Sequence, residues 1–142
     1  MVNICNRTLG LYSRNTHSLK FEVSHCTRSV LCQSLVNSQR NLAANGVKNA
    51  CVVTGDAYAS VDGKFSAILL NPPIRAGKQV IYGMFDESFN RLTPGGTLTI
   101  VIRKQQGAPS AKKYLEELFG NCETIAKSGG YWILRCRKEK SE

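Results

Sequence analysis

Residues 71–74 have the composition of a rigid loop that presents hydrogen-bond acceptors. They are Asn71, Pro72, Pro73 and Ile74. Pro72 fixes its own φ angle and pushes Asn71 toward extended geometry, and neither proline has an N–H group. The proline carbonyls and the Asn71 side-chain oxygen can therefore accept hydrogen bonds from a planar amine, which shifts electron density toward the amine nitrogen. A turn that merely ends a strand is the alternative interpretation.

The segments around this loop alternate between strand and helix patterns. Short apolar runs predict strands over residues 50–54, 65–70 and 97–102, and the run over 65–70 leads directly into the loop. Apolar residues at helical spacing predict a helix that stops at Asn45-Gly46, one over 79–92, and one from an N-cap at Ser110 to Gly120. Two final strands, over 124–127 and 131–137, are expected to form a hairpin.

This alternation predicts one α/β domain that spans all 142 residues, with a mostly parallel sheet and an antiparallel C-terminal hairpin. Ligands of such sheets bind beyond the carboxyl ends of the strands, so the loops after residues 54, 70 and 102 are the expected site. Residues 1–40 differ, since only 20–23 resemble a strand. We expect no convincing first strand there.

Composition narrows the function classes. The net charge of +9 favours a polyanionic partner, although a basic excess can also serve solubility alone. No apolar run approaches the ~20 residues of a membrane helix. The six cysteines form no CxxC pair and have no histidine at zinc-site spacing, so we expect reduced thiols and no metal site. Together with the lack of a membrane-length apolar run, this predicts a soluble cytoplasmic protein.

Three segments in order carry a family resemblance: residues 71–78 (NPPIRAGK), 107–110 (GAPS) and 131–135 (YWILR). They resemble the catalytic half of class I S-adenosylmethionine-dependent methyltransferases, which have a Rossmann-like sheet. More narrowly, they are similar to small bacterial 16S ribosomal RNA guanine-N2 methyltransferases. The resemblance covers about residues 41–138 and implies S-adenosylmethionine as the cofactor, with ribosomal RNA or the small ribosomal subunit as the partner.

The resemblance implies catalytic roles for the loop. Asn71 and Pro72 would hold the target amine against the methyl donor, with Pro73 beside them and Ile74 where relatives often carry an aromatic residue that stacks on the base. Four cations that follow strand ends would hold RNA phosphates, and solvated surface charge is the alternative for each. They are Arg75, Lys78, Arg103 and Lys104.

The cofactor-binding part departs from the family pattern. Asp56 corresponds to the residue that accepts a hydrogen bond from the cofactor adenine, with Ala57 beside it, and Asn71 would also touch the cofactor. Gly10 is implied as the tail of the glycine-rich loop that follows the first strand, but the rest of that loop and the acidic residue after the second strand are missing. One hypothesis is that residues 1–40 are a truncated, frame-shifted version of the normal amino-terminal half.

Three functions therefore compete. The chain could methylate the N2 amine of guanine in small-subunit ribosomal RNA. It could instead be a catalytically impaired RNA-binding fragment, or an unstable remnant. Within the enzyme class, Asn-Pro-Pro loops also occur in methyltransferases that act on adenine in DNA or on glutamine in proteins.

Overall fold

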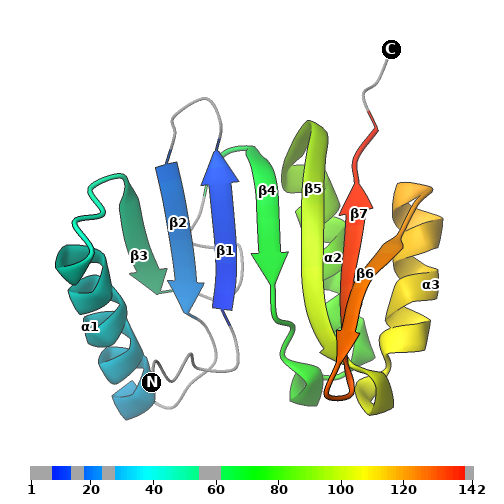
Figure 1. Cartoon of the computed structure of the whole chain (residues 1–142), viewed down its shortest axis with the longest axis horizontal. Coiled ribbons are helices and arrows are strands. Elements are labelled where there is room, and N and C mark those ends of the chain that lie inside the picture. Colours follow the sequence, from blue (N-terminus) through cyan, green and yellow to red (C-terminus); the bar gives the residue numbers. More distant parts are fainter. Residues whose placement is uncertain (1–7, 14–17, 24–27, 55–61, 140–142) are drawn as a thin grey trace.

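A single sheet organises the described part of the chain. The structure, a computed structural model, describes residues 8–13, 18–23, 28–54 and 62–139. In these residues seven strands pair in the order β3-β2-β1-β4-β5-β7-β6 (Figure 1). The strands are β1 (Thr8–Ser13), β2 (Ser18–Val23), β3 (Ala50–Thr54), β4 (Phe65–Leu70), β5 (Leu92–Arg103), β6 (Glu123–Ser128) and β7 (Tyr131–Arg137). The helices are α1 (Arg28–Ala44), α2 (Lys78–Arg91) and α3 (Ala108–Phe119), with short 3-10 turns η2 (Ile74–Ala76) and η3 (Lys104–Gln106).

Strand direction agrees with the predicted α/β fold. Strands β2, β3, β4, β5 and β6 run in one direction, and β1 and β7 run in the other (Figure 1). The C-terminal hairpin of β6 and β7 is confirmed. The reversal of β1, which is antiparallel to both β2 and β4, was not predicted.

The amino-terminal region contains more regular structure than expected. The sequence predicted no convincing first strand, yet β1 and β2 form a hairpin, and α1 begins at Arg28. Gly10 lies inside β1, where it pairs with Phe21 on one side and Leu69 on the other. The expectation that Gly10 belongs to a loop after a strand is therefore wrong, because its segment alternates apolar and polar residues and completes the ladder between β2 and β4.

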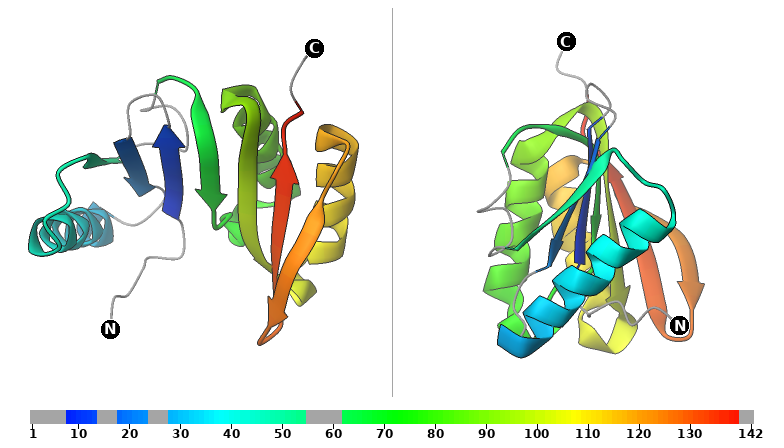
Figure 2. Two further views of the ribbon diagram at one scale, coloured as in Figure 1. Left: turned by 45° about the horizontal axis from the view of Figure 1, so that its top comes forward. Right: turned by 90° about the vertical axis from the view of Figure 1, so that its left-hand side faces the viewer.

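Helices α2 and α3 form the main core with one face of the sheet. They pack against each other and against β5 and β7, while α1 packs at the β3 edge (Figures 1 and 2). Phe85 of α2 and Leu115 of α3 are fully buried against Leu98 and Ile100 of β5 and Leu134 of β7. This apolar layer holds the ends of β4, β5 and β7 in fixed positions.

A stack of aromatic rings joins the two helices. The rings of Tyr82 and Tyr114 stack with their centroids 4.1 Å apart. The Tyr114 hydroxyl also donates a 2.8 Å hydrogen bond to a carboxylate oxygen of Asp86.

No helix in the described residues is long and apolar enough to cross a membrane.

Two predicted boundaries shift. Helix α3 begins at Ala108, and its N-cap is Gly107 instead of the predicted Ser110. Gly107 adopts a positive φ of 101°, and Pro109 is compatible with the first helical turn. The Ser110 hydroxyl donates to the Gly107 carbonyl at 3.1 Å. Strand β5 begins at Leu92 instead of residue 97, and the expected turn over 93–96 is an irregular part of that strand.

Candidate active site

The candidate site lies where β4 and β5 end and β7 begins. Asn71 follows the last residue of β4, and Arg103 is the last residue of β5. Strand β7 is antiparallel to β5, so Tyr131, its first residue, pairs with Arg103. The sheet thus brings Asn71, Arg103 and Tyr131 to the same edge, as expected for a ligand site at the carboxyl ends of parallel strands.

A pocket of about 460 Å³ opens at this edge. This volume lies in the range of small-molecule sites. The pocket is lined by Asn71, Pro72, Pro73, Ile74, Arg75, Arg103, Gln106 and Tyr131. The four loop residues that the sequence singled out therefore line one cavity together.

Burial and an internal hydrogen bond hold the loop in place, so fewer of its oxygen atoms are left to accept a hydrogen bond from a ligand. Pro72 and Pro73 are buried, whereas Asn71 is half-buried. The Pro73 carbonyl accepts a 2.8 Å hydrogen bond from the Ala76 amide, which closes the turn η2. The expectation that both proline carbonyls face a guest needs correction, because the Pro73 oxygen already has this partner. The side-chain amide of Asn71 and the backbone carbonyl of Pro72 have no hydrogen-bond partner within the described ranges.

Ile74 lies between the pocket and the hydrophobic core. Its side chain is half-buried and packs against the hydrophobic core beneath the loop. The residue also lines the pocket, where part of its side chain is accessible to a ligand. Its packing, however, gives it a structural role in anchoring η2.

Two of the four predicted RNA-contacting cations line the pocket. Arg75 and Arg103 are exposed there, and the Arg103 guanidinium lies over the Tyr131 ring, 4.8 Å from its centroid. Lys78, the first residue of α2, and Lys104, the first residue of η3, are also exposed but lie outside the lining. Among the described residues, the pocket lining carries two arginines and no carboxylate, which suits an anionic group such as a phosphate.

Sequence reasoning missed Gln106 and Tyr131 as site residues. The signal for Tyr131 was available, because an antiparallel strand beside β5 must begin where β5 ends. The hydrogen bond from the Lys104 amide to the Gly130 carbonyl, 2.8 Å long, fixes that approach. Tyr131 thus supplies the aromatic ring that the loop itself lacks at Ile74.

The predicted cofactor residues are only partly described. Asp56 and Ala57 lie outside the described residues, and Gly10 is inside β1. The strand register nevertheless places Thr54, Val23 and Leu70 at the same edge, so β3 ends on the side of the sheet where Asn71 lies. A half-buried Asn71 with an unengaged amide fits a methyl donor and a methyl acceptor that meet beside it. In the described residues, no group of three or more histidine, cysteine or acidic side chains is placed to hold a metal ion.

Comparison with known proteins decides the family. The family model of the methyltransferase small domain matches residues 13–135. The chain belongs to this family. The match spans both the candidate site and most of the sheet, and it confirms the resemblance seen in the three segments.

Curated relatives of this methyltransferase small domain are longer than the chain. YbxB, an uncharacterized protein of Bacillus subtilis, is 44% identical over 103 residues, which make up 71% of this chain and 51% of that protein. The ribosomal RNA small subunit methyltransferase C of Citrobacter koseri is 32% identical over 124 residues, which cover 84% of this chain and 34% of the relative. The chain therefore spans about half of the first relative and about a third of the second.

Solved structures confirm the methyltransferase fold. The 16S rRNA N2 G1207 methyltransferase of Thermus thermophilus, solved with S-adenosylmethionine and guanosine, is 28% identical with a TM-score of 0.63, covering 75% of this chain and 29% of that one. A methyltransferase from Pyrococcus furiosus has a TM-score of 0.64 at 20% identity, covering 83% of this chain and 62% of the other. The cofactor that the resemblance implied is thus the one bound in the Thermus enzyme.

Proposed function

We propose that this chain transfers a methyl group from S-adenosylmethionine to the exocyclic N2 amine of a guanine in small-subunit ribosomal RNA. One observation carries the proposal: the Asn71–Ile74 loop lines a pocket together with two arginines and a tyrosine at the carboxyl edge of the sheet. Relatives named as small-subunit ribosomal RNA methyltransferases support the substrate class. Such a substrate would place the protein in the cytoplasm.

The loop would orient the amine. The Asn71 side-chain oxygen and the Pro72 carbonyl are the acceptors without a described partner, so they can accept the two N–H groups of a flat amine. The two buried prolines that follow Asn71 keep these acceptors in place before the amine arrives. S-adenosylmethionine supplies a methyl group that its sulfonium has already activated, so the protein mainly needs to align the amine and exclude water.

The pocket walls would hold the rest of the nucleotide. Tyr131 presents a ring to a base, and Arg75 and Arg103 present guanidinium groups to phosphates. The N2 amine of a paired guanine lies in the minor groove, so the base must be unpaired or turned out of the stack to reach Asn71. The cofactor would be held on the side of Asn71 where β3 ends, with Asp56 and Ala57 as the predicted contacts.

Other amine substrates would use the same acceptors. Adenine in DNA and glutamine in proteins both carry a planar amine, and the loop alone does not separate them. The two arginines favour a nucleic acid over a protein side chain, because they match phosphate groups. An impaired RNA-binding fragment would keep this basic surface and lose cofactor binding.

Methyl transfer from labelled S-adenosylmethionine to small-subunit ribosomal RNA tests the proposal. We expect Asn71→Ala to lower the transfer rate by about 100-fold or more, since misplaced reacting atoms lose most of the benefit of orientation. Asn90→Ala, an exposed asparagine on α2, is the matched control and should leave the rate unchanged. Asp56→Ala should weaken the binding of S-adenosylmethionine in calorimetry.

The alternatives give different results. Salt-sensitive RNA binding with no calorimetric signal for S-adenosylmethionine would assign the chain to the binding-fragment class. Aggregation without a cooperative melting transition would indicate an unstable remnant. An Asn71→Ala variant as active as the parent chain would refute the role of the loop.

A further inference from the structure

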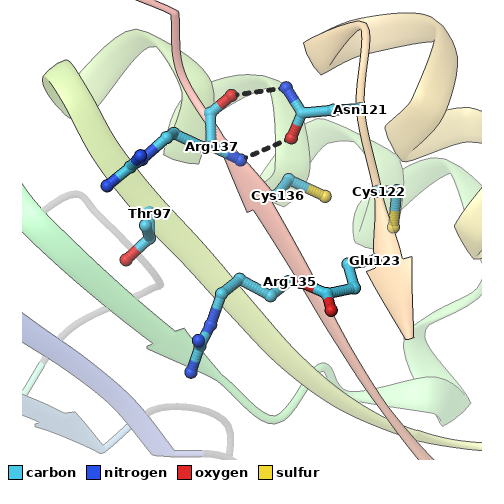
Figure 3. A pocket seen from close by; sticks show the side chains of 7 residues that line it. All are labelled: Thr97, Asn121, Cys122, Glu123, Arg135, Cys136 and Arg137. Carbon is cyan, nitrogen blue, oxygen red and sulfur yellow. Dashed lines mark hydrogen bonds between the residues drawn. The ribbon is translucent and has the colours of Figure 1, made fainter. Parts of the chain in front are cut away.

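Two cysteines face each other across the C-terminal hairpin. Glu123 of β6 pairs with Arg135 of β7, and one step along this register places Cys122 opposite Cys136. A further step places Asn121 opposite Arg137, where the asparagine side chain continues the ladder. Its amide donates a 2.8 Å hydrogen bond to the Arg137 carbonyl and accepts one of 2.8 Å from the Arg137 amide (Figure 3). The position of Cys122 is therefore fixed from both sides.

This arrangement has the geometry that a disulfide requires. Directly opposed residues of an antiparallel pair have Cα atoms about 4.5 or 5.5 Å apart, and their side chains share one face. Disulfides form across Cα separations of about 4.4–6.8 Å. Cys122 and Cys136 can therefore join with little movement of either strand. Both thiols are reduced in the structure.

The two thiols differ in access and acidity. Cys122 is half-buried, whereas Cys136 is 1% exposed. Both line a pocket of about 550 Å³ that also contains Thr97, Asn121, Glu123, Arg135 and Arg137 (Figure 3). A hydrogen bond from the Cys136 thiol lowers the pKa of Cys122, and the same bond together with burial raises the pKa of Cys136.

Two charged side chains near Cys122 have opposite effects on the pKa of its thiol. The Glu116 carboxylate raises the pKa of Cys122, and the Lys112 ammonium lowers it. These two residues form an ion pair of 3.2 Å on α3, so their effects on the thiol partly cancel. The bond from Cys136 remains the largest influence.

We propose that Cys122 and Cys136 form a site of reversible oxidation, at which hydrogen peroxide converts the two thiols into a disulfide. The Cys122 thiolate sulfur attacks one peroxide oxygen, the O–O bond breaks, and the other oxygen leaves as water after taking a proton. The Cys136 sulfur then attacks the Cys122 sulfur, an S–S bond forms, the S–O bond breaks, and the hydroxide takes the Cys136 proton and leaves as water. The two thiols lose two electrons, and hydrogen peroxide is reduced to two molecules of water.

The thiol pair lies away from the candidate active site. Tyr131 begins β7 at the pocket edge, and Cys136 is near the other end of the same strand (Figure 1). The disulfide is thus expected to form whether or not the chain binds S-adenosylmethionine. Failure of the methylation proposal would leave this inference unaffected.

Mass spectrometry of the full chain tests the inference. A variant in which Cys5, Cys26, Cys32 and Cys51 are replaced by serine leaves only the proposed pair. After treatment with hydrogen peroxide, we expect its intact mass to fall by two hydrogen atoms and peptide mapping to link Cys122 to Cys136. Dithiothreitol should restore the original mass.

Single substitutions in this variant separate the two roles. With Cys136→Ala, peroxide should leave a sulfenic acid on Cys122 that dimedone traps. With Cys122→Ala, the buried Cys136 should stay reduced on the same timescale, and circular dichroism checks that each variant is folded. If Cys136→Ala does not fold, Cys122→Ala and the parent variant still decide the outcome. Direct oxidation of Cys122 to the sulfinic acid with Cys136 present, a disulfide between two chains, or no reaction would each overturn the inference.

Discussion

Tyr131 provides a sharp test of how the pocket holds a base. Its side chain is 40% exposed, and Arg103 already covers part of one ring face at 4.8 Å from the centroid. The exposed part of the ring can contact a base. We therefore expect Tyr131→Ala to weaken the binding of a short single-stranded RNA that contains guanine.

The size of the effect follows from stacking. A base stacked on an aromatic side chain contributes about 1–3 kcal/mol. Because the ring is only 40% exposed and Arg103 covers part of it, we expect about 1–2 kcal/mol, which corresponds to about 5- to 30-fold weaker binding. The Tyr131→Phe variant keeps the ring and should bind within about twofold of the parent chain, since the stacking surface is retained.

Fluorescence anisotropy with two RNA strands isolates the base contact. One strand carries the guanine, and the other has an abasic site at the same position. Tyr131→Ala should reduce the affinity for the first strand and leave the affinity for the second nearly unchanged. Equal losses for both strands would refute stacking and would indicate that the substitution acts through the phosphate contacts of Arg103 instead.

Two further predictions concern stability and are checked by urea unfolding. The Tyr114 hydrogen bond to Asp86, aided by burial, raises the pKa of the phenol, so its stabilisation should be present below pH about 10 and lost as pH rises through the folded-state pKa. Tyr114→Phe should cost about 1 kcal/mol at pH 7 and remove this alkaline loss, and an unchanged pH profile would contradict the assignment. Gly96→Ala should cost about 1–3 kcal/mol, since an added Cβ would lie 2.9 Å from a carbonyl oxygen. Gly83→Ala, in open space on α2, should instead stabilise the fold by about 0.5–1 kcal/mol; a shift in the same direction for both glycines would contradict the packing argument.

The sequence predicted the second half of the fold well because its local signals agree. The α2 helix, the strand β4, the hairpin and the stop at Gly120 follow from apolar periodicity and from glycine turns. Boundaries were less accurate where backbone geometry competes with side-chain preference. Gly107 and Pro109 moved the start of α3, and pairing with β4 extended β5 through residues that read as a turn.

The site was predicted only in part, because sequence reasoning groups residues that are close in the chain and not those that long-range pairing brings together. Residues that are close in the chain, such as Asn71 and Pro72, could be grouped from spacing alone. Tyr131 joins them only through the pairing of β7 with β5, which is a long-range contact. Lys78 and Lys104 were expected near the pocket because they follow strand ends, but the turns η2 and η3 contribute Arg75 and Gln106 to its lining instead.

The frame-shift hypothesis for residues 1–40 stays a prediction. The reversed β1 gives it a structural context, since an ordinary strand in that position would be followed by the cofactor loop at the active edge. In this chain β1 instead ends at Ser13, at the opposite edge from Leu70. Reading the encoding DNA in its other two frames tests the hypothesis directly.

The edge of β4 that faces β1 has a wider consequence. Backbone ladders accept a partner strand in either orientation, because N–H and C=O groups alternate along any extended chain. Strand β4 also contributes Phe65, Ile68 and Leu70 to the buried core that it shares with β5, β7, α2 and α3. An edge of this kind can pair with different amino-terminal segments, so recombination can exchange the strands beside β4 while the Asn71–Ile74 loop that follows β4 is kept.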